Sequence, residues 1–351
     1  MTDLAVAGVP LDRMRSWGPA KISKRGLAVI RWCAIAASCL ACAPPRSPAP
    51  LQGTVTIATL HSEALGVDKR VVVYLPAGYD RDPDRRWPVF YYLQGTTSEE
   101  TEWVTYGMID RAADALGLDA IIVMPDGDDA FYVDSPMAVD YAACLRDGTG
   151  LYDRHEDPPQ TCVRAPRYET YVVRDVVDWV DATYRTINRR DGRAIAGLSM
   201  GGYGALMLAM RHPERFAAVA SHSGLDALLY RGPHPYAPDA VELYDDPATY
   251  GNDNDRDDTY ARLVFGNDIA FWRARDPALL AQTLAPGQLA IYLDCGAEDR
   301  LVDGARYLDA ILTSHHLDHV FWTGPGKHDY ELWRARLPVS LAFLRDHVAR
   351  R

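Results

Sequence analysis

Residues 194–202 read AIAGLSMGG, and this short stretch decides the fold. The apolar run 194–196 predicts a β-strand, and residues 203–210 have the composition of a helix that ends before Pro213. A Gly-x-Ser-x-Gly pattern between a strand and a helix is typical of a nucleophile elbow, a strained turn that projects a serine above a sheet. The glycines let the strand and the helix pass without side-chain clashes. We therefore expect Ser199 to be a nucleophile.

The same turn predicts a site for a developing negative charge. The backbone N–H of Met200 lies at the positive end of the following helix, where an oxyanion would be stabilised. A second oxyanion donor is expected from the turn after the apolar run 87–93, and its position there assigns Thr96. Gly95 before it lets a substrate approach closely, so we count Gly95 as substrate-binding. Trp103 is expected to line the cleft, with ordinary core packing as its alternative role.

An acid and a base are expected after the later strands. In this type of fold the order along the chain is serine, acid, histidine, which favours Asp299 and His328. The histidine would take the serine proton, and the acid would fix the histidine tautomer. Glu298 and Asp294 are the alternative acids. His222 is the alternative base, but it precedes the acid in the chain, and we therefore place it among the substrate-binding residues.

Apolar runs alternate with amphipathic segments, which predicts an α/β fold with a mainly parallel sheet and helices on both faces. Residues 54–60 and 70–75 are expected to form an antiparallel hairpin at a sheet edge. An irregular insertion at about 126–166 and a longer stretch at 225–285 break the alternation, and we interpret the second as a lid over the carboxyl ends of the strands. Further strands are expected at 87–93, 120–124, 194–196, 216–220, 288–293 and 319–322, and helices at 103–117, 171–184, 203–210, 305–312 and 330–348.

Composition and charge limit the possible partners. The 351 residues are 48% hydrophobic and 24% charged, which is ordinary for a globular protein. The net charge is −11 although residues 1–42 carry six Lys/Arg against two Asp/Glu, so the rest is strongly acidic and argues against nucleic acid. Asp253, Asp255 and Asp257 alternate as in a calcium loop, but Asp258 stands where that loop needs Gly. We expect neither a metal nor a cofactor.

The N-terminus has the pattern of a targeting segment. Residues 1–43 combine a basic region, a short apolar run and small residues, as secretory and lipoprotein signals do, and Met14 is an alternative start. The run is too short and too basic to predict a membrane span. A Pro-rich linker follows at 44–53, and residues 54–351 are the expected catalytic domain. We expect export, either as a cell-envelope lipoprotein anchored through Cys42 or in secreted form.

Two cysteines fall in the irregular insertion. In an oxidising compartment Cys144 and Cys162 could close a loop of 18 residues. Such a bridge would stabilise the insertion by roughly 3 kcal/mol in the loop-entropy model, and two free thiols are the alternative. Cys295 ends an apolar run and is expected to be a buried thiol rather than a nucleophile.

Several short segments match a known family. They are Tyr92–Gly95 with Trp103, Val123–Gly127, Tyr168–Thr170, Ala196–Ala205, His212–Pro213, Ser223–Gly224, Gly296–Asp299 and Gly326–His328. In them the chain resembles, over roughly residues 55–346, the serine esterase family that includes S-formylglutathione hydrolases, feruloyl esterases and mycolyltransferases. The resemblance implies an α/β-hydrolase fold with Ser199, Asp299 and His328 as the triad. Gln94 departs from the His that usually precedes this Gly; because the oxyanion donors are main-chain amides, we expect only an adjusted turn.

These observations favour a serine carboxylic-ester hydrolase that works through an acyl-enzyme. Its expected substrates are short acyl esters of small molecules or acylated sugars, which it would encounter at the cell envelope. One alternative is an acyltransferase that uses the same triad with an alcohol in place of water. Another is a non-catalytic, hydrolase-like envelope binding protein. Trapping of products with added alcohols separates the first alternative, and labelling with a fluorophosphonate separates the second.

Overall fold

The computed structural model describes residues 52–148, 158–251 and 256–349. Among them, no helix is both long and apolar enough to cross a membrane. Some of the features expected from the sequence lie outside the described residues: the signal at 1–43 with its Cys42, most of the linker at 44–53, and Asp253 and Asp255 of the alternating aspartates.

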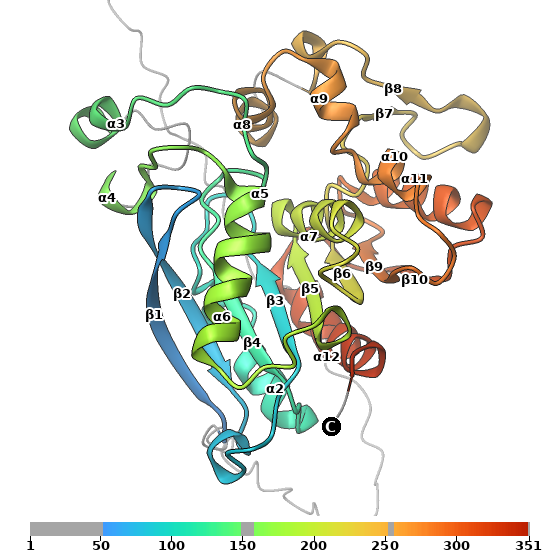
Figure 1. Cartoon of the computed structure of the whole chain (residues 1–351). Coiled ribbons are helices and arrows are strands. Elements are labelled where there is room, and N and C mark those ends of the chain that lie inside the picture. The colour runs from blue at the N-terminus through green and yellow to red at the C-terminus, as the bar shows by residue number, and fades with distance from the viewer. Residues whose placement is uncertain (1–51, 149–157, 252–255, 350–351) are drawn as a thin grey trace, which may run out of the picture. The chain divides into compact units, whose positions relative to one another are not determined.

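One sheet organises the described part of the chain (Figure 1). Its eight strands there are β1 (Thr54–Ser62), β2 (Val67–Leu75), β3 (Val89–Leu93), β4 (Ile121–Pro125), β5 (Arg193–Leu198), β6 (Ala218–His222), β9 (Ala290–Gly296) and β10 (His319–Gly324). They lie in the order β1-β2-β4-β3-β5-β6-β9-β10. β1 pairs with β2, and β2 with β4, in antiparallel fashion, and the other neighbours are parallel. The predicted mainly parallel sheet is confirmed.

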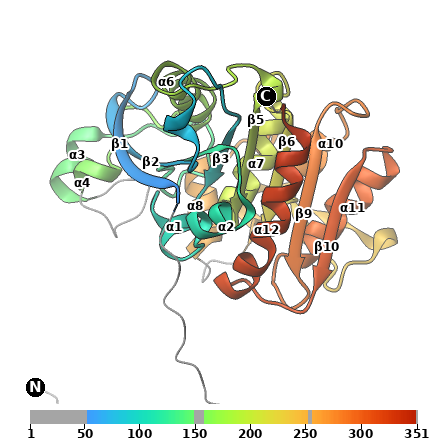
Figure 2. The ribbon, with the colours of Figure 1, turned by 90° about the horizontal axis from the view of Figure 1, so that it is seen from below.

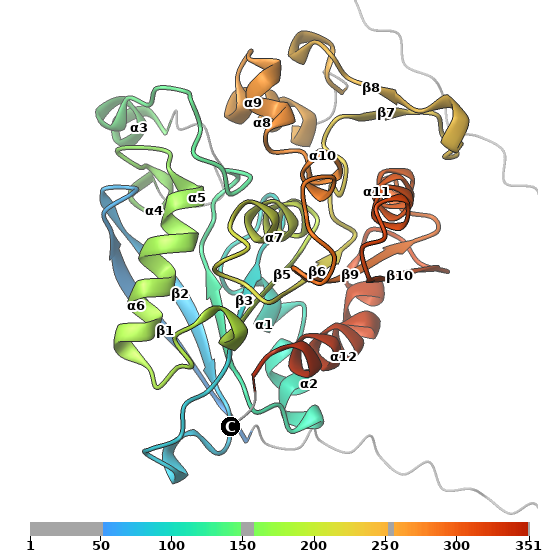
Figure 3. The same ribbon diagram turned by 45° about the vertical axis from the view of Figure 1, so that its right-hand side comes forward.

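Helices cover both faces of this sheet, as Figures 2 and 3 show. They are α1 (Glu102–Thr105), α2 (Ile109–Leu116), α5 (Tyr168–Thr170), α6 (Val177–Thr183), α7 (Met200–Arg211), α11 (Val302–Ser314) and α12 (Tyr330–His347), with a π-helical stretch (Tyr171–Val176) between α5 and α6. Side chains alternate along each strand, so β3 sends Phe90 and Tyr92 toward α2 and α12. Tyr91 and Leu93 face the layer of α6, α7 and α11.

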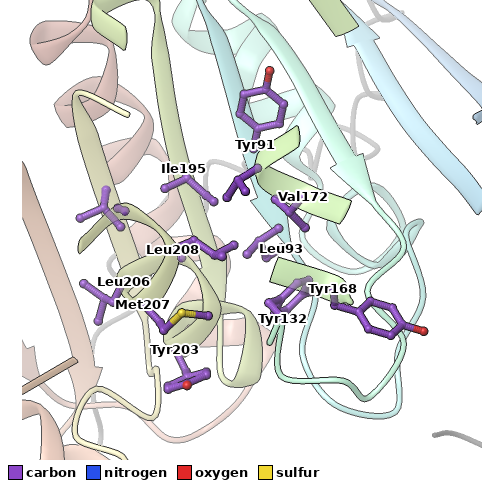
Figure 4. Packing of buried hydrophobic residues seen from close by; sticks show 14 of the residues in the cluster. Tyr91, Leu93, Tyr132, Tyr168, Val172, Ile195, Tyr203, Leu206, Met207 and Leu208 are labelled. Carbon is purple, nitrogen blue, oxygen red and sulfur yellow. The ribbon is translucent and has the colours of Figure 1, made fainter. Parts of the chain in front are cut away.

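The elbow helix α7 lies at the centre of the core. Residues 200–210 are all buried, as expected for a helix that is apolar on every side. Figure 4 shows Leu208 of α7 beside Leu93 of β3, with Met207 and Tyr203 farther along the helix in the same buried cluster. The turn that carries Ser199 is therefore followed by a helix that is buried along nearly its whole length.

The two segments that break the α/β alternation contain short elements of their own. The insertion holds α3 (Tyr141–Asp147) and α4 (Pro158–Thr161), and a disulfide joins Cys144 to Cys162 with 5.8 Å between the Cα atoms. Cys295 is a buried free thiol. In the stretch 225–285 the described residues form β7 (Tyr230–Gly232), β8 (Glu242–Leu243), α8 (Arg256–Phe265), α9 (Ile269–Arg273) and α10 (Pro277–Ala281).

The helix expected over 103–117 is divided, which corrects the sequence prediction. α1 ends at Thr105 and α2 begins at Ile109. Between them Met108 adopts a left-handed φ of 56°. At Gly107 a Cβ would lie 2.6 Å from the carbonyl oxygen of Trp103, so the chain turns where only glycine fits.

Candidate active site

Ser199 occupies the sharp turn between β5 and α7, with φ 53° and ψ −120°. Few residues adopt such a conformation, which costs on the order of 1–3 kcal/mol and persists only where the surroundings enforce it. Close backbone packing does so here. A Cβ on Gly197 would lie 2.2 Å from the carbonyl oxygen of Gly201, and a Cβ on Gly201 would lie 2.3 Å from that of Leu93. Any larger residue at either glycine of the motif would therefore collide with a neighbouring backbone carbonyl.

The structure brings Ser199, His328 and Asp299 together from three separate turns. His328 lies between β10 and α12, and Asp299 lies between β9 and α11. Nε2 of His328 is 3.0 Å from the Ser199 hydroxyl oxygen. Nδ1 of His328 is 2.8 Å from Oδ2 of Asp299. The three side chains form one continuous chain of hydrogen bonds at the carboxyl ends of the strands.

The Asp299 carboxylate is held in its charged form. Burial alone would raise its pKa, but the hydrogen bond and the charge of His328 and the N–H of Leu301 outweigh burial, and the pKa lies below its usual value. An ionised Asp299 requires Nδ1 of His328 to donate. Nε2 is then an acceptor, directed at the Ser199 hydroxyl. This arrangement can remove a proton from the serine.

The rival acids do not reach His328. Asp294 is fully buried and its Oδ1 lies 3.0 Å from Nδ1 of His222. Glu298 is exposed, whereas Asp299 beside it is buried. Only Asp299 of the three carboxylates is hydrogen-bonded to the histidine of the site, within the described residues.

The two residues expected to supply oxyanion donors lie near the serine. Met200 is the first residue of α7, at the end of a helix where N–H groups lack helical partners. Thr96 and Met200 both line a small cavity next to Ser199. The N–H of Gly95 is turned the other way, because it donates to Oε2 of Glu102 at 2.8 Å. The Gly95 N–H is therefore already engaged, and of the two residues in this turn only Thr96 lines the small cavity, so its amide stays the predicted second oxyanion donor.

Two cavities have Ser199 in their walls. The larger, about 500 Å³, contains His328 in its wall, and Gly95 lines it as expected. The smaller, about 30 Å³, does not have His328 in its wall. Its wall consists of Thr96, Phe131, Ser199, Met200, Leu225, Tyr250, Asp257, Asp258, Ala261, Arg300 and Leu301.

Two residues expected to bind substrate do not reach these cavities. His222 is 0% exposed and bridges Asp294 and the hydroxyl of Ser340. Trp103 is 1% exposed, and its Nε1 donates to the carbonyl of Leu93 at 2.9 Å. The assignment of both to the substrate cleft was wrong. Being last in a strand does not decide which face a side chain takes, and His222 faces the layer of α12.

A further buried carboxyl lies near the acid of the site and was not singled out from the sequence. Asp226 is 1% exposed and accepts a hydrogen bond from the Ser221 hydroxyl at 2.6 Å. Burial, reinforced by the charges of Asp294 and Asp299, raises its pKa to about 8. The carboxyl is therefore protonated at neutral pH in the folded protein.

We expect Asp226→Asn to change how stability depends on pH. The unfolded aspartate ionises near pH 4 but the folded one near pH 8, so its stabilising contribution is complete below pH 4 and is lost as the pH rises to 8. Asparagine does not titrate and can still accept from Ser221. Between pH 5 and 8 the variant should gain up to about 1.4 kcal/mol per pH unit over the wild type.

Urea unfolding at pH 5, 6, 7 and 8 measures this difference. Asp318→Asn, at an exposed aspartate, is the matched control and should show no such slope. A stability difference between Asp226→Asn and wild type that stays constant over the range would contradict the assigned protonation.

Comparisons with known proteins identify the family of this chain. A family model described as "Putative esterase" matches residues 62–344. An esterase of Mycobacterium tuberculosis is 31% identical over 163 residues, which is 46% of this chain and 30% of the mycobacterial protein. The chain spans less than two thirds of the length of the curated relatives it matches.

Solved structures show the same fold. A ferulic acid esterase superposes with a TM-score of 0.62 at 24% identity, over 85% of this chain and 99% of that one. An S-formylglutathione hydrolase of Agrobacterium tumefaciens superposes with a TM-score of 0.63 at 18% identity, over 86% and 97% of the two chains. At these identities the likeness establishes the α/β-hydrolase architecture and leaves the substrate to the residues of the site.

Proposed function

The chain belongs to the family described as putative esterases, and on that premise we propose that it hydrolyses short-chain esters of uncharged alcohols through an acyl-enzyme at Ser199. One observation carries the proposal: the unbroken hydrogen-bonded chain from Ser199 through His328 to Asp299. The serine oxygen attacks the ester carbonyl carbon while Nε2 of His328 takes its proton. Asp299 stabilises the resulting imidazolium.

The next steps use the amides beside the serine. The carbonyl oxygen becomes negatively charged and lies between the N–H groups of Met200 and Thr96. The C–O bond to the alcohol then breaks as His328 protonates the departing oxygen. Water, deprotonated by the same histidine, attacks the acyl-enzyme and releases the carboxylic acid with Ser199 restored.

The two cavities support an orientation for the ester. Because His328 delivers a proton to the alcohol oxygen, the alcohol must lie in the cavity that contains His328, which measures about 500 Å³. The acyl chain is then directed into the cavity of about 30 Å³. A space of that size holds about two water-sized groups, which matches an acetyl or propionyl chain.

The wall of the larger cavity favours an uncharged alcohol. Glu102, Asp257 and Asp329 line it, and the described residues of its wall include no Lys or Arg, although Asp257 pairs with Arg300 at 2.8 Å. An anionic alcohol or thiol such as glutathione would therefore meet repulsion there. Tyr106, 56% exposed, offers a ring with a hydroxyl, a surface suited to a sugar. Acylated carbohydrates therefore remain the substrates we favour.

We expect activity to fall with acyl length. For p-nitrophenyl esters kcat/KM should be highest for acetate and propionate, and at least about 10-fold lower for hexanoate, because the smaller cavity cannot hold the added methylenes without displacing its wall. Steady-state kinetics on a series from acetate to decanoate measures this profile. A maximum at octanoate or longer would contradict the assignment of the smaller cavity to the acyl chain.

A matched pair of substitutions sharpens the same test. Leu225→Ala enlarges the smaller cavity and should raise the ratio of hexanoate to acetate activity by about 10-fold. Leu263→Ala removes an equal side chain from an exposed position on α8 outside the cavity wall, and should leave that ratio unchanged.

We propose that this hydrolysis takes place at the cell envelope. The basic and apolar pattern of residues 1–43 supports export, and the Cys144–Cys162 disulfide suits an oxidising compartment. Fractionation of producing cells, with palmitate labelling of wild type and Cys42→Ser, tests location and anchoring. Recovery in the cytosol would contradict export, and equal labelling of both proteins would contradict the anchor at Cys42.

A further inference from the structure

One buried carboxylate joins the turn of the proposed oxyanion donor to the turn of the base. Glu102, the first residue of α1, is 5% exposed. Its Oε2 accepts the N–H of Gly95 at 2.8 Å. Its Oε1 accepts the hydroxyl of Tyr330, the first residue of α12 and two positions after His328. The two turns are far apart in sequence and meet at this side chain.

The Tyr330 end of this link continues to the base through aromatic contacts. The ring of Tyr330 lies edge-on to Trp333, with 4.9 Å between centroids and 85° between planes. Trp333 in turn lies edge-on to the imidazole of His328, at 5.0 Å and 86°. Tyr330 is therefore connected through two direct ring contacts to the imidazole of His328.

The Gly95 end is equally constrained. A Cβ on Gly95 would lie 2.7 Å from Cδ1 of Leu198, so the backbone is pressed against the strand that ends at the nucleophile. The side chain of Gln94 donates to the carbonyl of Ser98 at 2.6 Å, closing the turn. Glu102 fixes the direction of the Gly95 N–H, and with it the start of the peptide unit that presents Thr96.

We propose that Glu102 is a positioning residue that sets the Thr96 N–H and the His328 imidazole relative to each other. The inference rests on the proposed function, because it assigns Thr96 to the oxyanion and His328 to proton transfer. Main-chain donors act only when aimed at the place where charge develops in the transition state. A shift of the donor or base by about 1 Å from a substitution outside the reacting groups can lower the rate 100-fold.

The expected signature is a loss of kcat without a matching change in KM. Glu102→Ala removes the hydrogen bonds to Gly95 and to Tyr330. It should lower kcat on p-nitrophenyl acetate by about 100-fold and leave KM within about 3-fold of the wild-type value. Tyr330→Phe removes one hydroxyl and should lower kcat by about 10-fold. Both hydrogen bonds, from Gly95 and from Tyr330, are accepted by the one carboxylate of Glu102. The double variant Glu102→Ala/Tyr330→Phe should therefore have the kcat of Glu102→Ala alone, and the two losses should not multiply.

A conservative substitution and a matched control separate positioning from general stability. Glu102→Gln should recover kcat to within about 10-fold of wild type, because its amide oxygen can accept from Gly95 while its amino group donates to the Tyr330 oxygen. Glu100→Ala removes another buried glutamate of the same loop, which pairs with Arg70 at 2.8 Å. It should lower the melting temperature and leave kcat within about 2-fold.

Wild type and Ser199→Ala are measured alongside these variants. Any one of three results would overturn the positioning role while esterase activity stands. They are a wild-type kcat in Glu102→Ala, multiplicative losses in the double variant, and a kcat loss in Glu100→Ala equal to that in Glu102→Ala. If Glu102→Ala does not fold, Tyr330→Phe decides through its kcat and KM. Absence of turnover and of fluorophosphonate labelling in the wild type would instead overturn the proposed function, and the positioning role with it.

Discussion

Ser199→Ala should lower kcat/KM on p-nitrophenyl acetate by about 10⁶-fold. The hydroxyl oxygen lies 3.0 Å from Nε2 of His328, and its loss removes the atom that would bond to the acyl group. No other group in the proposed reaction forms the covalent bond to the acyl carbon. Water attack assisted by the remaining amides would account for the residual rate, which should stay about 10³–10⁴-fold above the uncatalysed reaction.

Labelling with a fluorophosphonate provides an independent readout of the same residue. Wild type should be labelled and the alanine variant should not, because the probe forms its covalent bond with an activated serine oxygen. Far-UV circular dichroism and the melting temperature establish that the variant is folded. Equal turnover in both proteins would exclude Ser199 as the nucleophile.

Asp299→Asn should lower kcat by about 10⁴-fold with little change in KM. The Asp299 carboxylate accepts from Nδ1 of His328 at 2.8 Å and thereby leaves Nε2 free to accept the serine proton. An asparagine amide can donate to Nδ1 instead, which favours the tautomer whose Nε2 already carries a hydrogen. It also removes the negative charge that stabilises the imidazolium.

Glu298→Gln is the control for this prediction, at the exposed neighbour that local sequence leaves as an alternative acid. Its kcat should remain within about 2-fold of wild type. Steady-state kinetics of the two variants at pH 8 compares them directly. A large loss of kcat in Glu298→Gln together with normal activity in Asp299→Asn would contradict the assignment of Asp299 as the acid.

The elements around the elbow could be predicted because their signals are local. Strand β5, the Gly-x-Ser-x-Gly turn and helix α7 are consecutive in the chain, and a short apolar run, the motif and a helical composition mark them directly. The order of Asp299 and His328 follows from the succession of strands, and the structure places both beside Ser199. The broken helix at Gly107 was missed, since its cause is contact with the carbonyl of Trp103, which an amphipathic pattern does not report.

The supporting residues of the site could not be predicted, because their partners are distant in the sequence. Glu102 pairs with Tyr330, 228 positions away, and no local pattern connects them. His222 belongs to a buried network with Ser340, 118 positions away, so its place at the end of β6 suggested a cleft that it does not reach. Side-chain contacts of this kind depend on how helices α1 and α12 pack against the sheet.

The buried elbow has a consequence for how this protein could acquire new substrates. Gly201 lies against the backbone of Leu93 in the middle of the sheet, so the attacking atom and the Met200 amide are part of the rigid frame. Leu225 and Tyr106, by contrast, border the cavities from segments outside the sheet. Mutations at these positions can change which ester is accepted without changing the geometry of attack. Substrate selectivity can therefore evolve while the reactivity of the serine is retained.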